Sequence, residues 1–228
     1  EVLEHLCALP ATERTLDRAK ELARAFWPKV EENEDFIGLE LSDDEARGFR
    51  WQAWLAIAGL WKLEDPAEVE VISTEQKVVA DLAGVPFLGI VDRLDRIGGK
   101  LVVSDYKSGT LPGARWREDK MQQVLLYAAA IEKVQGEQPE RARLLYLGQR
   151  ILDVVVTDHK IETAAEQLAE TWVGIQRSCT SSDFEAKPGV LCGWCPFAAE
   201  CPEGHAELVR RQAAGNLPAH APARALVA

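Results

Sequence analysis

The chain has 228 residues, of which 47% are hydrophobic and 28% are charged, as in an ordinary globular protein of one domain with small additions. Its net charge of −11 and pI of about 4.9 argue against a nucleic-acid binder that works through overall positive charge. No hydrophobic run approaches the about 20 residues that cross a bilayer, and the first residues carry charges where a secretory signal has its apolar core. These features predict a cytoplasmic protein.

Residues 1–65 are predicted to form a helical N-terminal region. The first stretch, VLEHLCALP, has hydrophobic residues at helical spacing. The chain begins inside this pattern, at Glu1, so we expect the native protein to extend upstream. The sequence SDDE at 42–45 has the spacing of a capping box and predicts the start of another helix. The tryptophans of that helix are expected in the core rather than on a base-stacking platform: Trp51, Trp54 and Trp61.

Residues 66–180 are predicted to form an α/β core. Alternating hydrophobic residues from 68 to 107 indicate three antiparallel strands, the second ending at Asp92 and a Gly98-Gly99 turn leading into the third. A helix is expected over about 117–135, followed by a strand (RARLLYLGQ), its partner (ILDVVVT) and an amphipathic helix (IETAAEQLAETWVGIQRS). This order of elements predicts a mixed central sheet with flanking helices.

Two carboxylates are predicted to meet at the ends of neighbouring strands. Asp92 closes one strand and Asp105 the next, and Lys107 follows two positions later. Two carboxylates at one edge of a sheet form a hard-oxygen site of the kind that holds Mg²⁺ or Mn²⁺. Glu75, on the preceding strand, is either an outer member of this site or a surface residue. Asp95 is expected to pair with Arg93 or Arg96 on the surface.

Gln123 and Tyr127 lie one helical turn apart and share a face of the helix predicted at 117–135. Two interpretations remain open. The tyrosine hydroxyl is buried and satisfied by a neighbour, or the two side chains form a polar ledge that holds a phosphate or the nearby lysine.

Residues 181–204 form a cysteine-rich segment, and residues 205–228 are predicted to be a flexible tail because they are rich in proline and alanine. Cys192, Cys195 and Cys201 have the spacing C-x2-C-x5-C, which indicates metal ligation. Zinc completed by His205 and an iron–sulfur cluster with a fourth ligand from elsewhere both remain open. Two further cysteines are expected to lie outside the metal site, Cys179 as a bystander and Cys7 as a buried structural residue.

The stretches GIVDRLD, VVSDYKSG, QVLLY and CGWC with a later Cys-Pro, in this order, resemble the RecB-type exonucleases of the PD-(D/E)XK superfamily. The CRISPR-associated exonuclease and its phage and actinobacterial homologues look most similar. The resemblance covers roughly residues 1–204 and implies a restriction-endonuclease-like core. It also implies that Asp92, Asp105 and the Tyr106 carbonyl bind a catalytic Mg²⁺ or Mn²⁺. Lys107, Gln123 and Tyr127 would be catalytic, and Cys192, Cys195 and Cys201 would bind a [4Fe–4S] cluster that joins the C-terminal end to an N-terminal segment.

The family pattern also has a metal-binding histidine and a first cluster cysteine, which in this chain would both lie upstream of Glu1. His5 and Cys7 come a turn or more too late to replace them. The sequence therefore predicts a metal-dependent DNA exonuclease that acts on single strands or ends. A non-catalytic, metal-stapled DNA-binding module of a helicase or CRISPR integration complex is the alternative, and a zinc-ribbon protein is a third interpretation.

Overall fold

The computed structural model describes residues 1–227, and the chain divides into two compact units. The division falls between residues 172 and 173, within helix α6 (Asp158–Ser181) and close to the predicted end of the α/β core. The first unit contains the N-terminal helices and the sheet, and the second contains the cysteine-rich segment. Within the described residues, none of the helices is both long and apolar enough to span a membrane.

The N-terminal region is helical, as predicted. Side chains cap the starts of three of its four α-helices, because a helix leaves its first N–H groups without partners. In the predicted capping box, Ser42 accepts a hydrogen bond from the Glu45 N–H, and the Glu45 carboxylate accepts one from the Ser42 N–H. The helices of this region are α1 (Val2–Cys7), α2 (Leu16–Glu31), α3 (Glu34–Ile37) and α4 (Asp43–Ala58).

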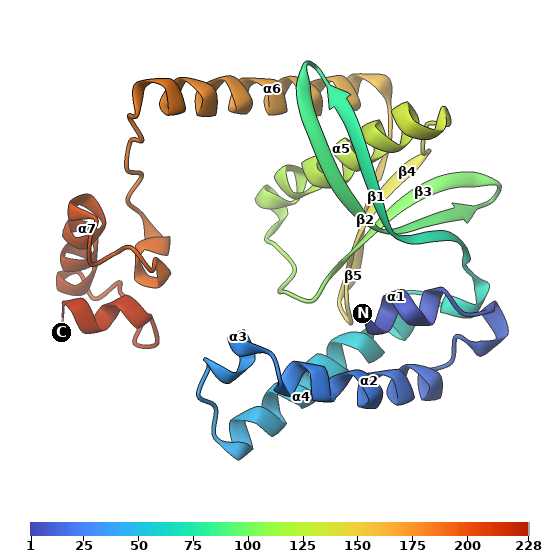
Figure 1. Cartoon of the computed structure of the whole chain (residues 1–228), viewed down its shortest axis with the longest axis horizontal. Coiled ribbons are helices and arrows are strands. Elements are labelled where there is room, and N and C mark those ends of the chain that lie inside the picture. Colours follow the sequence, from blue (N-terminus) through green and yellow to red (C-terminus); the bar gives the residue numbers. More distant parts are fainter. Residues whose placement is uncertain (228) are drawn as a thin grey trace. The chain divides into compact units, whose positions relative to one another are not determined.

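A five-stranded mixed sheet forms the centre of the first unit (Figure 1). The order is β1-β2-β3-β4-β5, and every neighbouring pair is antiparallel except the parallel pair β3 and β4. Two-residue turns with positive φ at both positions, Ala83-Gly84 and Gly98-Gly99, join the first three strands. The strands are β1 (Glu70–Leu82), β2 (Val85–Ile97), β3 (Lys100–Lys107), β4 (Arg141–Tyr146) and β5 (Arg150–Val155).

Helix α5 (Arg117–Gln135), which matches the predicted helix, connects β3 to β4 and packs against the sheet. Its buried side chains, such as Val124 and Ile131, share the main hydrophobic core with strand residues such as Val103. A second core forms between the sheet and the N-terminal helices, where Leu6 and Leu60 contact Leu145. The sheet is therefore covered by hydrophobic contacts from both α5 and the N-terminal region.

A contact between two glycines joins the end of α4 to the turn between β4 and β5. The Gly148 N–H donates a hydrogen bond of 3.1 Å to the Gly59 carbonyl. A Cβ atom at Gly59 would lie 2.5 Å from the backbone nitrogen of Gly148, closer than side-chain carbons approach a backbone. Only glycine permits this approach, so the contact fixes the N-terminal helices on the sheet.

The prediction that the tryptophans of α4 lie in the core is wrong for Trp51, whose side chain is 57% exposed. Trp54, and Trp61 in the 3₁₀ helix Gly59–Lys62 that follows α4, are partly buried against the second core, as expected. No residue within α4 itself is fully buried. The hydrophobic pattern of this helix therefore marks a face that solvent can reach along part of its length.

The second unit has regular structure where the sequence predicted a flexible tail. Helix α7 (Pro202–Ala213) follows the last cysteine of the segment, and a 3₁₀ helix spans Pro222–Leu226. Leu208, Leu217 and Ala221 are buried together in a small hydrophobic cluster. The alanines of this stretch can form a packed structure because they surround the two leucines of this cluster.

Candidate active site

Three carboxylates lie in a row across the first three strands. In the register of β1 and β2, Thr74 pairs with Arg93 and Gln76 with Val91, so Glu75 falls at the position opposite Asp92. The register of β2 and β3, continued one residue past its last pair, places Asp105 opposite Asp92 on the other side. Residues that face each other across antiparallel strands have Cβ atoms about 4.5–5.5 Å apart, and like charges there destabilise the sheet. We call Glu75, Asp92 and Asp105 the carboxylate row.

Asp92 lies within its strand rather than at the strand end, which corrects the sequence prediction. Strand β2 continues through Ile97. The polar residues that suggested an end, Arg93 and Asp95, are both fully buried and paired with each other. A strand can accommodate such residues when their charges are compensated.

The backbone of Glu75 is left-handed, with φ of 47°, a conformation that residues other than glycine rarely adopt. Such strain is concentrated at functional sites in proteins. Burial raises the pKa of the Glu75 carboxyl, and the neighbouring charges of Asp92 and Glu4 raise it further. Glu4, on α1, is a residue that the sequence reasoning missed, because nothing in the local pattern of α1 indicates that it approaches β1.

Asp105 is only 3% exposed, yet its Oδ2 atom lies 2.7 Å from the Lys107 ammonium. Burial raises the pKa of the Asp105 carboxyl, the hydrogen bond from Lys107 lowers it, and the charge of Asp92 raises it, with a net upward shift. The Asp92 carboxylate accepts a hydrogen bond of 2.8 Å from the Tyr106 N–H. Negative charge is thus concentrated where the three strands meet.

The polar ledge predicted on α5 is adjacent to Lys107. The Lys107 ammonium donates to the Gln123 side-chain oxygen at 3.1 Å, and the Gln123 amide nitrogen donates to the Tyr127 hydroxyl at 2.8 Å. An ammonium group has three donors. Gln123 holds one of them and Asp105 pairs with the ammonium charge, so Lys107 keeps a donor that it can direct toward a bound group.

No group of three or more His, Cys, Asp and Glu side chains close enough to hold a metal ion forms within residues 1–227. The carboxylate row nevertheless fits Mg²⁺ or Mn²⁺ by its donor chemistry, because these ions prefer carboxylate and carbonyl oxygens. The raised pKa values of Glu75 and Asp105 are partly due to mutual repulsion, which a divalent cation would relieve.

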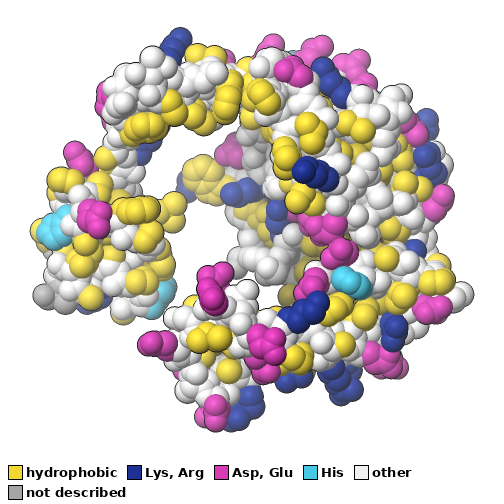
Figure 2. Space-filling view, viewed as in Figure 1, with side chains coloured by type: hydrophobic (Ala, Val, Ile, Leu, Met, Phe, Trp, Pro, Cys, Tyr) yellow, Lys and Arg dark blue, Asp and Glu magenta, His cyan; other side chains and the backbone are white. Residues whose placement is uncertain are grey.

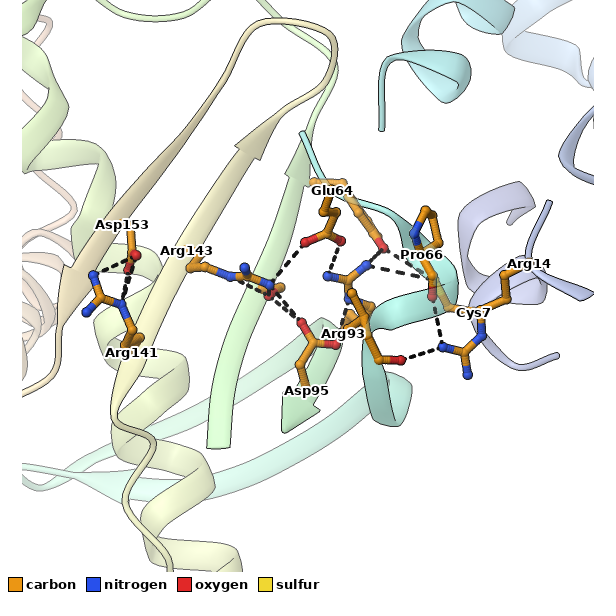
Figure 3. A network of polar contacts seen from close by, with 12 residues as sticks. Cys7, Arg14, Glu64, Pro66, Arg93, Asp95, Arg141, Arg143 and Asp153 are labelled. Carbon is orange, nitrogen blue, oxygen red and sulfur yellow. Dashed lines mark hydrogen bonds and ion pairs between the residues drawn. The ribbon is translucent and has the colours of Figure 1, made fainter. Parts of the chain in front are cut away.

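A buried ion network supports the same strands (Figure 3). Arg93 lies 2.5 Å from Glu64 and 2.7 Å from Asp95, and Arg143 lies 3.1 Å from Asp95. The expectation that Asp95 pairs with Arg93 is confirmed, but its expected surface position is wrong. Arg93 also donates to the Tyr106 hydroxyl at 2.7 Å. Because side chains alternate along a strand, the network supports β2 and β3 from the face opposite to Asp92 and Asp105.

The cysteines of the second unit lie around its small hydrophobic cluster. The Gly189 N–H donates to the Cys192 sulfur at 3.3 Å, and the Gly204 N–H donates to the Cys201 sulfur at 3.2 Å. Cys192 and Cys195 pack against the cluster. Cys179 and His205 are exposed, and Cys7 is buried in the first unit, as expected.

A mixed sheet with flanking helices, crossed by a carboxylate row beside a lysine, is the arrangement of a PD-(D/E)XK nuclease fold. The chain belongs to the PD-(D/E)XK nuclease superfamily, whose family model matches residues 1–202. Membership indicates a nuclease that uses a divalent metal ion such as Mg²⁺ or Mn²⁺ and acts on DNA. Among curated proteins, none matches the chain significantly.

Proposed function

We propose that the protein is a Mg²⁺- or Mn²⁺-dependent DNA exonuclease that acts mainly on single strands or DNA ends. The observation that carries this proposal is the carboxylate row with Lys107 paired to Asp105 at its end. Superfamily membership supports the cleavage of DNA, and the resemblance to RecB-type sequences supports the exonuclease specificity.

Asp92 and Asp105 would hold the metal ion together with the Tyr106 carbonyl, and Glu75 would be the outer member of the site. When bound, the metal ion supplies Lewis-acid activation of the phosphate and of the attacking water. Asp92 is positioned by the hydrogen bond from the Tyr106 N–H. Burial and mutual repulsion raise the pKa values of the other two carboxyls, so metal binding weakens when acid protonates them.

Lys107 would orient the water or stabilise the charge that develops on the phosphate. Asp105 and Gln123 hold its ammonium group, and Tyr127 in turn holds Gln123. Such fixed donors stabilise developing charge because they need no reorganisation during the reaction. Gln123 and Tyr127 therefore act by positioning Lys107 rather than by contacting the reacting atoms.

For the second unit, we infer that Cys192, Cys195 and Cys201 bind a thiophilic metal, with a [4Fe–4S] cluster favoured over zinc by the resemblance. The donor chemistry fits, because backbone N–H groups already point at two of the sulfurs, as they do around metal-bound thiolates. Free thiols stay reduced in the cytosol, so cysteines that bind a metal agree with the predicted cytoplasmic location.

The test compares Asp92→Ala and Asp105→Ala with wild type on an end-labelled single-stranded oligonucleotide in Mn²⁺. Both variants should lose cleavage, whereas Asp153→Ala, an aspartate of β5 outside the site, should retain it. Addition of EDTA should stop the wild type. Cleavage that survives EDTA or Asp105→Ala contradicts the proposal. DNA binding without cleavage by the wild type supports the non-catalytic DNA-binding module instead.

A further inference from the structure

A groove leads from the carboxylate row along the N-terminal helices. Its volume is about 910 Å³, and its walls come from α1, α2 and α4, with Glu75 and Asp92 among its lining residues. This volume is near the upper end of the about 300–1,000 Å³ of small-ligand sites. A candidate active site that opens into a groove of this size has room for more substrate than the reacting phosphate.

Aromatic side chains that the cores do not bury line this groove. Phe49 is 46% exposed and Trp51 is 57% exposed, and both project from α4. Trp54, one turn beyond Trp51 on α4, lines the groove as well and is only partly buried. Large aromatic side chains left open to solvent in one depression indicate a binding surface. We call Phe49, Trp51 and Trp54 the aromatic platform.

Positive charges lie beside the aromatic platform. Lys20 and Arg24, on α2, line the groove and form no ion pair within residues 1–227. Arg50 lines it too, with its guanidinium 5.1 Å from the centre of the Trp27 ring. Figure 2 shows Lys and Arg side chains next to hydrophobic ones where the N-terminal helices lie, in the lower part of the view. Glu1 and Glu4 line the groove on its α1 side, and the charge of Glu4 acts on Glu75 of the carboxylate row. The part of the groove formed by α2 and α4, where cations lie beside aromatic side chains, is therefore the part suited to an anionic ligand with apolar faces.

We propose that this groove binds single-stranded DNA, with unpaired bases stacked on the aromatic platform and phosphates contacted by Lys20, Arg24 and Arg50. A polyanion fits the cations, and aromatic stacking fits bases that are not already stacked within a duplex. The groove then leads the strand to the carboxylate row. Cleavage of the bound strand rests on the proposed function, whereas binding of the strand in the groove does not, because binding can be measured without cleavage.

The experiment measures the fluorescence anisotropy of a labelled single-stranded oligonucleotide in EDTA, so that no cleavage occurs. Trp51→Ala and Phe49→Ala should each weaken binding about 5- to 150-fold, the range expected for the loss of one stacked base. Trp51→Phe should restore most of the affinity, because phenylalanine still stacks. The control is Phe184→Ala, since Phe184 is 68% exposed and lies outside the groove. Unchanged melting temperatures should accompany these variants.

Salt dependence gives an independent measure of the cationic side chains. The Lys20→Ala/Arg24→Ala double variant should reduce the slope of log affinity against log salt by about 0.7 for each phosphate that the protein no longer neutralises. Equal binding by wild type and Trp51→Ala overturns the inference, as does a duplex that binds as tightly as the single strand. Wild type that binds as expected but never cleaves in Mn²⁺ contradicts the proposed function and leaves the groove assignment standing.

Discussion

Asp95 holds together the buried network beneath the candidate site, and its replacement by Asn tests how much that network contributes. The wild-type network is neutral, with Arg93 and Arg143 facing Glu64 and Asp95 (Figure 3). Asp95→Asn keeps the size of the side chain but removes one negative charge. The remaining excess positive charge is buried, because the Arg93 side chain is 0% exposed and that of Arg143 only 10%.

Removal of one partner from a buried ion pair destabilises proteins by about 3–5 kcal/mol, because the other charge is left without compensation. For a unit of about this size, each kcal/mol lowers the melting temperature by about 2–4 °C. The variant should therefore melt about 6–20 °C below wild type. Such a loss is large against the about 5–15 kcal/mol that stabilises an ordinary domain.

Urea denaturation, monitored by circular dichroism, measures the difference in the free energy of unfolding between Asp95→Asn and wild type. Asp153→Asn is the matched control. Asp153 pairs with Arg141 at 2.7 Å, the same separation as between Asp95 and Arg93, but both side chains of the control pair are at least 31% exposed. An exposed pair contributes about 0–1 kcal/mol. If the two variants lose the same stability, burial is not the source of the effect and the reasoning is refuted.

Three further predictions concern the candidate site and the cysteines. Gly89→Ala should lower the cleavage rate, because a Cβ there would lie 2.8 Å from the Tyr127 ring and displace it from Gln123; a rate equal to wild type would contradict the ledge. Cys195→Ser should release bound iron or zinc, measured by elemental analysis, whereas Cys179→Ser should not. Burial raises the pKa of the Asp105 carboxyl in the folded protein above its pKa in the unfolded chain, which is about 3.9. The metal-free wild type therefore loses stability as the pH rises from the unfolded pKa through the folded pKa. Asp105→Asn removes this loss and should therefore melt higher than wild type in EDTA at neutral pH, with the difference closing in acid.

Local patterns in the sequence were enough to predict most of the fold. The capping box at Ser42, the Gly98-Gly99 turn and helix α5 depend on residues close together in the chain, and all three are confirmed. The course of β2 beyond Asp92 was not predictable in this way. Its polar residues are compensated by Glu64 and Arg143, which are distant in sequence, so the pattern suggested a strand end.

The candidate site was predictable in its residue types rather than in its surroundings. The spacing of Asp105 and Lys107 indicated that they share a face, and they form an ion pair. The left-handed backbone at Glu75 leaves no signal in the sequence, because glutamate does not favour it. Hydrophobic periodicity predicted that α4 has an apolar face, but it could not indicate that Trp51 would remain uncovered.

The contact between Gly59 and Gly148 fixes the position of α4 along the sheet as well as its packing on the sheet. It holds the end of α4 against the β4–β5 turn with no room for a side chain, so the aromatic platform cannot slide along the sheet. A base stacked on the aromatic platform, as proposed above, would therefore lie at a constant distance from the carboxylate row. Cleavage products of such a nuclease would then end a fixed number of nucleotides from the stacked base.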